Sequence, residues 1–398
     1  MPSSLSKIIK DRANLYFLGV ALILTSTLEL PIPIPVVVFY SLGFLIVFSE
    51  LVYKCYKNQA DILYNNYTFF LFLTLALSCA VNGIFNYRAF LLLCFVFFFG
   101  SCVSSSSCFK FKILLINYFC EACTIITAIN LVCYITGFNG IRPPDNPLEF
   151  KGITFISMWL SPIASISAIY SLLKLFNAIT FRWRLYFFLN VACSVFVCVA
   201  AGSRSATIAM LAASACIVFF NTKNIKRFII AVLVSTVVLL ALFPFLDTQR
   251  METKQETQEE LGRNSRANLW ESRFAEIEQS PFLGVGLSVS LQDGNKLSEG
   301  RNESGSGWLS IASQTGLLSL LLFGLCLLNV LSTKKRNISA SPSLILTFSI
   351  LVFICLHSVA EGYFLTAGYW LCMFFWLCLG CLTDAKRIPQ TVQNLNLD

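Results

Sequence analysis

Charged residues are scarce in this sequence: they make up 13% of its 398 residues, whereas 56% are hydrophobic. A soluble globular domain carries about 25% charged residues, so the composition excludes one. The apolar residues instead form long runs, for example residues 15–28, 69–81, 228–245 and 308–330. Runs of this length are typical of helices that cross a bilayer, and we expect a polytopic membrane protein.

Motifs that mark several other classes of membrane protein are also missing. The chain has no GxxxxGK loop for ATP, no HExxH zinc motif and no DxD pair to hold a metal against a nucleotide-sugar diphosphate. These absences argue against an ATP-driven pump, a zinc protease and a metal-dependent transferase, so we expect no metal and no cofactor. The 16 cysteines lie almost entirely inside apolar runs, where cysteine behaves as a small buried hydrophobe.

The basic residues gather in alternate connections between the apolar runs. The positive-inside rule places these connections, and both termini, in the cytoplasm. The expected fold is all-α: a polytopic transmembrane helix bundle of about 12 spans with one large extracytoplasmic loop. Residues 1–246 would hold the first nine spans, residues 247–306 the loop, and residues 307–398 the last three spans and a cytoplasmic tail. The predicted spans are residues 13–29, 34–53, 67–85, 89–106, 113–136, 153–173, 185–201, 205–220, 228–246, 307–331, 343–360 and 365–382.

A tight polar connection, residues 202–205, joins two mid-chain spans on the outer side, where basic residues are disfavoured. Arg204 must therefore lie near the edge of the hydrocarbon, where an unpaired charge is costly. It could snorkel to a lipid phosphate, as arginines at helix ends do. The favoured interpretation is that its planar guanidinium grips a phosphate group of a substrate through two hydrogen bonds.

The long outer loop is expected to contain a helix over residues 265–279, because its apolar residues recur at helical spacing and Pro281 follows its end. Arg266 and Arg273 lie two turns apart with Trp270 between them, so one face can present two guanidiniums and an indole. The alternative is a surface helix on which neighbouring glutamates neutralise the arginines. That alternative applies to Arg273 more readily than to Arg266.

Polar residues also mark the entrance to the tenth and the end of the eleventh span. Arg301 and Glu303 precede the tenth span. Burial beside lipid would raise the pKa of the Glu303 carboxyl and make it a general base, although Glu303 could equally cap the helix. His357, the only histidine, stands four residues before Glu361 on the same expected helical face. A lone buried histidine is more often structural, but one paired with a carboxylate also suits proton transfer or a hydrogen bond to the substrate.

A further outer connection, residues 137–152, contains Arg142 and three prolines. The prolines stiffen the segment and its mixed charges keep it in contact with water. It is interpreted either as a loop that lines the substrate site, with Arg142 as its contact, or as a rigid connector, which is somewhat favoured.

These features together resemble the O-antigen ligase and O-antigen polymerase superfamily of membrane glycosyltransferases. The resemblance rests on the GSRSA stretch at residues 202–206, followed by one hairpin and a large outward loop. It rests further on Arg266, Trp270 and the PFLGVG sequence of residues 281–286, which match an Arg, a Trp, a Pro and a Gly-x-Gly turn. Residues 302–316 stand where the ligases carry a His-Asn pair.

Asn302 and Glu303 occupy the position of that His-Asn pair, a departure that favours the polymerase branch over the ligases. The resemblance implies a GT-C-like bundle and a donor glycan carried on undecaprenyl diphosphate. Without a metal, arginines must stabilise the departing diphosphate. The expected diphosphate ligands are Arg204, Arg266 and Arg273, the expected catalytic residues are Glu303, His357 and Glu361, and the expected substrate-lining residues are Arg142, Trp270 and Arg301.

The expected function is therefore a polysaccharide polymerase of the bacterial inner membrane. The growing glycan would leave its lipid carrier and join the non-reducing end of a new lipid-linked repeat unit on the outer face. Two alternatives stay open, a ligase that passes the glycan to lipid A core or protein, and a flippase or other transporter. The expected partners are membrane lipids and the lipid-linked oligosaccharide, with a chain-length regulator and a flippase as candidate proteins and no nucleic acid.

Overall fold

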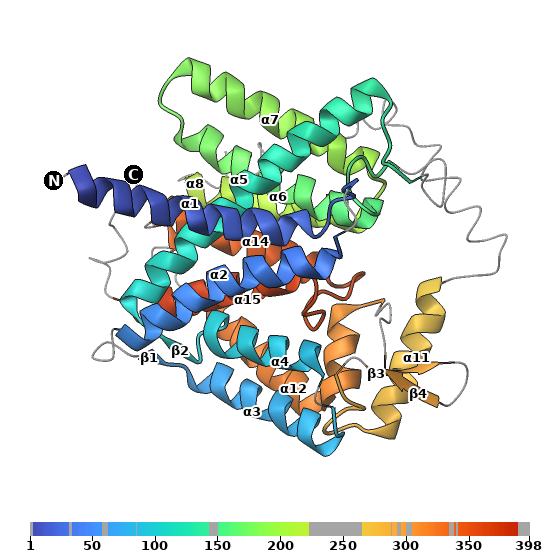
Figure 1. Ribbon diagram of the computed structural model, residues 1–398. Coiled ribbons are helices and arrows are strands. Elements are labelled where there is room, and N and C mark those ends of the chain that lie inside the picture. The colour runs from blue at the N-terminus through green and yellow to red at the C-terminus, as the bar shows by residue number, and fades with distance from the viewer. Residues whose placement is uncertain are drawn as a thin grey trace. The chain divides into compact units, whose positions relative to one another are not determined.

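The computed structural model describes residues 3–31, 34–57, 63–84, 86–142, 150–222, 265–287, 289–292, 296–299, 305–333, 338–339 and 341–388. These residues are predominantly helical (Figure 1). The helices are α1 (Ser3–Thr25), α2 (Val36–Lys57), α3 (Asn66–Val81), α4 (Tyr87–Cys94), the π-helix η2 (Phe95–Phe99), α5 (Ser106–Thr136), α6 (Ser157–Asn177), α7 (Phe181–Ala200), α8 (Arg204–Asn221), α11 (Ser265–Gln279), α12 (Gly307–Leu331), α14 (Pro342–His357) and α15 (Trp370–Ala385).

Six of these helices are long and apolar enough to cross a membrane, which supports a polytopic membrane protein. They are Val36–Cys55, Ser106–Thr136, Ser157–Asn177, Phe181–Ala200, Arg204–Asn221 and Gly307–Leu331. Shorter apolar helices lie where further spans are predicted, for example Asn66–Val81 and Pro342–His357. The ninth predicted span and the first part of the large loop lie outside the described residues, so the count of twelve spans and the three-part division stay predictions.

Two short antiparallel strand pairs modify the all-α expectation. β1 (Leu63–Tyr64) pairs with β2 (Val103–Ser104), and β3 (Val289–Gln292) pairs with β4 (Lys296–Glu299). The first pair ends the predicted fourth span early, because the chain leaves its helix at Phe99 and turns through Ser101, whose φ is 66°. The second pair lies within the predicted outer loop.

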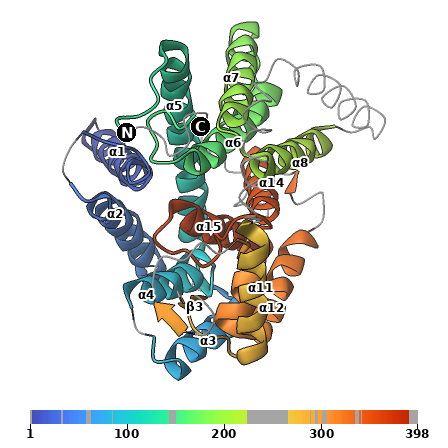
Figure 2. The ribbon, with the colours of Figure 1, turned by 90° about the vertical axis from the view of Figure 1, so that its right-hand side faces the viewer.

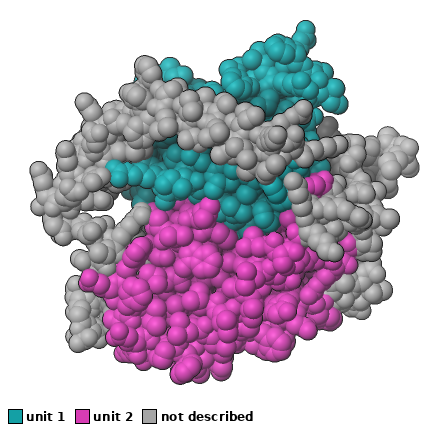
Figure 3. All heavy atoms as spheres, turned by 180° about the vertical axis from the view of Figure 1, so that it is seen from behind, with its two compact units in different colours: residues 1–53, 113–254, 342–353 teal, residues 54–112, 255–341, 354–398 magenta. Residues whose placement is uncertain are grey.

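The chain forms two compact units, coloured separately in Figure 3. The first comprises residues 1–53, 113–254 and 342–353. Its described centre is α6, which packs against α7 and α8 (Figure 2). Serine and alanine recur along α6, and such small residues let neighbouring helices approach closely in a membrane. The Ser167 and Ser194 hydroxyls meet at 2.8 Å between α6 and α7.

The second unit comprises residues 54–112, 255–341 and 354–398. Its α15 is apolar on every side, and all of its residues are buried, as expected for a helix without a polar face. α15 contacts η2 and α12, while α12 also contacts α3 and α11. The Lys112 Nζ lies 3.0 Å from the Asp384 Oδ2 in a fully buried ion pair that fixes the end of α15.

Candidate functional site

The predicted tight connection around Arg204 is present in the first unit. α7 ends at Ala200, Gly202 adopts a φ of +74°, and the Ser203 hydroxyl accepts a hydrogen bond from the Ala206 N–H at 3.3 Å. Arg204 is the first residue of α8, and its side chain is exposed. The positive end of the helix dipole and the guanidinium therefore act together at one point, which favours a negatively charged group there.

The helix predicted over residues 265–279 is confirmed as α11 with the same bounds. The Trp270 Nε1–H donates to the Gly305 carbonyl at 3.2 Å, just before α12 begins. The indole thus fixes α11 to the start of α12 while its ring remains partly exposed. Arg266 lies one turn earlier on α11, and its side chain lies outside the described residues.

Arg273 faces the protein interior. Its side chain is 1% exposed, and its Nη1 lies 2.7 Å from the Oε2 of Glu276, which is also buried. The geometry therefore favours the alternative in which a glutamate neutralises this arginine. Because both residues belong to α11, the pair neutralises the arginine within the helix and leaves its charge unavailable to an incoming ligand.

The segment between α14 and α15 also docks on the start of α12. The Gly307 N–H donates to the carbonyls of Ser358 and Glu361, at 2.8 Å and 2.9 Å. α14 ends at His357, so Glu361 lies beyond the helix, and the prediction that both side chains share one helical face is wrong. The helix ends because residues 358–361 turn back toward α12.

Both side chains of that predicted pair are nevertheless buried near the start of α12. The His357 Nε2 lies 3.1 Å from the Tyr363 hydroxyl, and the Tyr363 ring stacks on Tyr369 with centroids 5.3 Å apart. A phenol in contact with an imidazole can fix its tautomer or pass a proton. The sequence did not single out Tyr363, since a tyrosine within an apolar stretch gives no such signal.

In the second unit, the chain at Gly305 to Gly307 is therefore contacted by Trp270 of α11 and by the segment after His357. Arg301 and Glu303, which precede it in sequence, lie outside the described residues. Their roles stay predictions.

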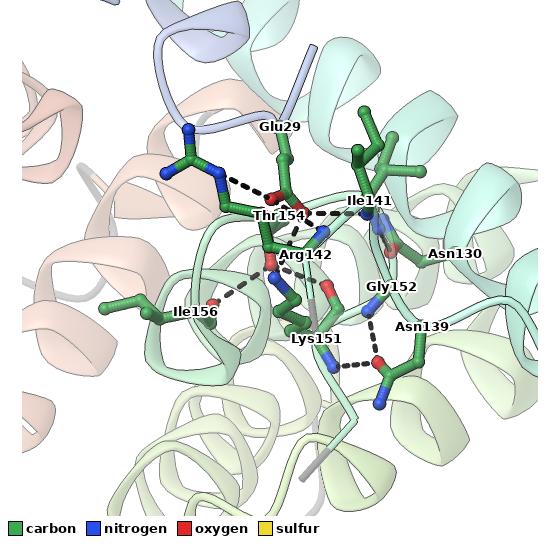
Figure 4. Close-up of polar contacts among 10 residues, drawn as sticks. Glu29, Asn130, Asn139, Ile141, Arg142, Lys151, Gly152, Thr154 and Ile156 are labelled. Atoms are coloured by element: carbon green, nitrogen blue, oxygen red, sulfur yellow. Dashed lines mark hydrogen bonds and ion pairs between the residues drawn. The ribbon is translucent and has the colours of Figure 1, made fainter. Parts of the chain in front are cut away.

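The base of the predicted outer connection at residues 137–152 is held by Glu29, in the first unit (Figure 4). The Glu29 carboxylate accepts hydrogen bonds from the backbone N–H groups of Ile141 and Arg142, at 3.0 Å and 3.1 Å. The Lys151 Nζ lies 3.0 Å from the same carboxylate, and Glu29 and Lys151 are both buried. These contacts agree with a rigid connector.

The Arg142 side chain is 81% exposed above this base, with its Nε 3.9 Å from Glu29. A rigid backbone thus carries an exposed guanidinium, so the connector and substrate-lining interpretations are compatible. Sequence reasoning did not select Glu29. Two features of the sequence could have indicated it. Glu29 is an acidic residue at the end of the first predicted span, and the basic Lys151 is predicted on the same, outer side of the membrane.

The family model for O-antigen ligase, Wzy_C, matches residues 189–324, about a third of the chain. The match includes Arg204, α11 and most of α12, and it ends before His357. It confirms the resemblance to the O-antigen ligase and polymerase superfamily. It also supports a glycosyltransferase-like membrane enzyme of surface-polysaccharide synthesis. No curated protein matches the chain.

Proposed function

Starting from the match to the O-antigen ligase family, we propose that this protein is a polymerase of O-antigen or a related surface polysaccharide. Its donor is a glycan on undecaprenyl diphosphate, and its acceptor is the non-reducing end of a second lipid-linked repeat unit. The main support for the proposal is that the residues matched by the family model include the structural features expected to bind the donor. The match contains the exposed Arg204 at a helix N-terminus and α11, which is fixed to the start of α12.

The proposed reaction needs one bond to break and one to form. The acceptor hydroxyl attacks the anomeric carbon of the donor glycan, and the bond from that carbon to the diphosphate oxygen breaks. Undecaprenyl diphosphate departs with the electron pair, and a base takes the hydroxyl proton. Because the leaving group is already activated, the reaction consumes no nucleotide.

Arg204 and Arg266 are the proposed ligands of the departing diphosphate, whose developing charge they stabilise. Arg273 is buried and paired with Glu276 of the same helix, so it is given no direct contact with the diphosphate. Glu303 is the proposed base, with the buried His357 and Glu361 as its support. The proposed lining of the glycan site is Trp270, Arg301 and Arg142.

The proposed location is the bacterial inner membrane, with both termini in the cytoplasm and the active site on the outer face. This orientation rests on the basic connections, which the positive-inside rule assigns to the cytoplasm. Lipid-linked repeat units would arrive from a flippase, and a chain-length regulator is a further proposed partner.

A ligase is the second candidate function, because the matching family model is that of O-antigen ligase. A ligase would use the same donor and the same arginines but pass the glycan to lipid A core or protein. The two functions differ in the acceptor alone.

The length of the glycan in cells that lack this protein separates the two candidates. A polymerase predicts surface glycan reduced to a single repeat unit, because flipping and ligation continue. Long glycan accumulating on the lipid carrier would contradict the polymerase and establish the ligase. Gel ladders of surface glycan and mass spectrometry of lipid-linked glycan give the two lengths.

A further inference from the structure

The PFLGVG sequence enters a break in α12. Gly316 has φ 87° and ψ 164°, so the helix is interrupted there, although the sequence reads as one span. In an unbroken helix the Leu317 N–H would donate to the Ser313 carbonyl. Here the Leu317 N–H donates to the Pro281 carbonyl at 2.8 Å, and the Ser313 carbonyl accepts from the Val285 N–H at 2.9 Å.

The inserted turn thereby replaces the hydrogen-bond partners that the break removes. The Gly286 N–H also donates to the Gln314 carbonyl, at 3.0 Å. A break in a membrane helix is tolerated where neighbouring protein satisfies the freed backbone groups in this way. Residues 281–287 and 313–317 are called the joint below.

The joint requires glycine where the two backbones meet. A Cβ on Gly316 would lie 2.0 Å from the Phe282 carbonyl oxygen, and one on Gly284 would lie 2.3 Å from the Gln314 carbonyl carbon. Neither backbone can retreat without losing the hydrogen bonds between them. The Gly-x-Gly turn therefore lets the loop approach the helix closely.

Two side chains also hydrogen-bond to the joint, one from α3 and one from the residue that caps its C-terminal end. The buried Ser78 hydroxyl donates to the Leu283 carbonyl at 2.6 Å and lies 3.3 Å from the Gln314 carbonyl. The Asn82 Nδ2 donates to the Gly284 carbonyl at 3.2 Å and to the Ser78 carbonyl at 2.8 Å. α3 thus supplies donors to carbonyls on both sides of the joint.

α11 is held to α12 at two points, through Trp270 on Gly305 and through the joint. Pro281 follows Trp270 by eleven positions, and Gly316 follows Gly305 by eleven positions. At the helical rise each interval is about 16 Å, so α11 runs along the first part of α12 in the same direction. Only Ser280 lies between α11 and the joint, so a shift of the joint shifts α11.

We propose that Ser78 and Asn82 are positioning residues for glycan transfer. By holding the joint they fix the position of α11, the helix that carries Arg266 and Trp270, which are the proposed contacts of the lipid-linked donor. The inference rests on the proposed function for the identity of that donor. The packing of the joint itself does not depend on it.

The test compares Ser78→Ala and Asn82→Asp with the unaltered protein in phospholipid vesicles. Asn82→Asp keeps the side-chain size but removes the donor. Thr74→Ala is the matched control, because its hydroxyl donates only to Leu71 within α3, and Ser78→Thr restores a hydroxyl. The measurements are amide hydrogen exchange of residues 281–287, and kcat and KM for an undecaprenyl-diphosphate-linked repeat unit.

Each of the two variants removes the one hydrogen bond that its side chain donates to residues 281–287. Each is expected to speed exchange in these residues and to raise KM by about tenfold, with kcat within about twofold. Ser78→Thr should restore both values. Exchange and KM equal to those of Thr74→Ala would overturn the proposal. Faster exchange with unchanged KM would overturn the positioning role alone. Absence of transfer by the unaltered protein would overturn the proposed function and this role with it, while exchange would still report on the joint.

Discussion

The two regions that carry the candidate arginines are built in different ways. Arg204 stands on a turn made by its immediate neighbours, with Gly202 at positive φ and Ser203 as the helix cap. α11 is held by residues far away in sequence, through the Gly305 carbonyl and through the joint with α12.

The two regions also use their arginines differently, one as an exposed charge that can bind a ligand and the other in a buried ion pair. Arg204 is exposed at the start of α8, whereas Arg273 is buried in α11 and paired with Glu276 of that helix. A buried pair is strongly destabilised when one partner is removed, while an exposed arginine is removed with little effect on folding. Substitutions at the buried Arg273–Glu276 pair should therefore act on stability, and substitutions at Arg204 on activity.

The largest effect is expected from Gly316→Val, which changes the residue at the break in α12. Its side chain would collide with the Phe282 carbonyl in a conformation that non-glycine residues rarely adopt. We expect a loss of about 3 kcal/mol or more of stability. The measurement is the thermal unfolding temperature in detergent. Gly324→Ala is the control, since nothing lies within 4 Å of a Cβ there, and equal unfolding temperatures would contradict the account of the break.

Glu276→Gln should have the next largest effect. It leaves the buried Arg273 guanidinium without a neutralising charge, at an expected loss of about 3 kcal/mol. Glu278→Gln, on the exposed face of the same helix, should change stability little. Denaturation of both variants in the same detergent compares them directly. A Glu276→Gln protein as stable as Glu278→Gln would mean that the buried Arg273 does not depend on Glu276 for a neutralising charge.

Arg204→Lys tests the local region. Lysine keeps the charge but loses the planar fork, so glycan transfer should fall by about tenfold or more at unchanged unfolding temperature. The control is Arg182→Lys, at the opposite end of α7. Initial rates of polymer formation give the comparison. Undiminished transfer would argue against two-point binding of a diphosphate by Arg204.

The smallest effect is expected from Ser203→Ala, which removes the cap of α8. Loss of an N-cap hydroxyl costs about 1 kcal/mol. Ser49→Ala is a suitable reference, because the Ser49 hydroxyl donates back within α2 and caps no helix. A Ser203→Ala protein as stable as the reference would show that more than local residues hold this turn.

The same contrast explains what the sequence could predict. Helical periodicity and Pro281 were enough to place α11 at residues 265–279, and the short connection was enough to place Arg204 at a helix start. Both depend on neighbours in the chain. The predicted pairing of His357 with Glu361 on one helix was wrong because α14 ends at His357. The residues that follow it accept hydrogen bonds from the start of α12 instead.

Long-range contacts were not predictable from one sequence. An apolar run through Gly316 gives no sign that a turn thirty residues earlier will enter it, and Glu29 shows no local reason to bind residue 141. The choice between a charge-presenting and a charge-neutralised Arg273 likewise depended on which face of α11 packs. Such choices are made by tertiary packing rather than by local preference.

The most direct test of the central claim uses the purified protein in phospholipid vesicles with an undecaprenyl-diphosphate-linked repeat unit as the sole substrate. The account predicts a ladder of lipid-linked glycan that grows by one repeat unit per rung, with one undecaprenyl diphosphate released per linkage and no nucleotide added. Unchanged single units, together with transfer as soon as a lipid A core acceptor is supplied, would contradict polymerisation.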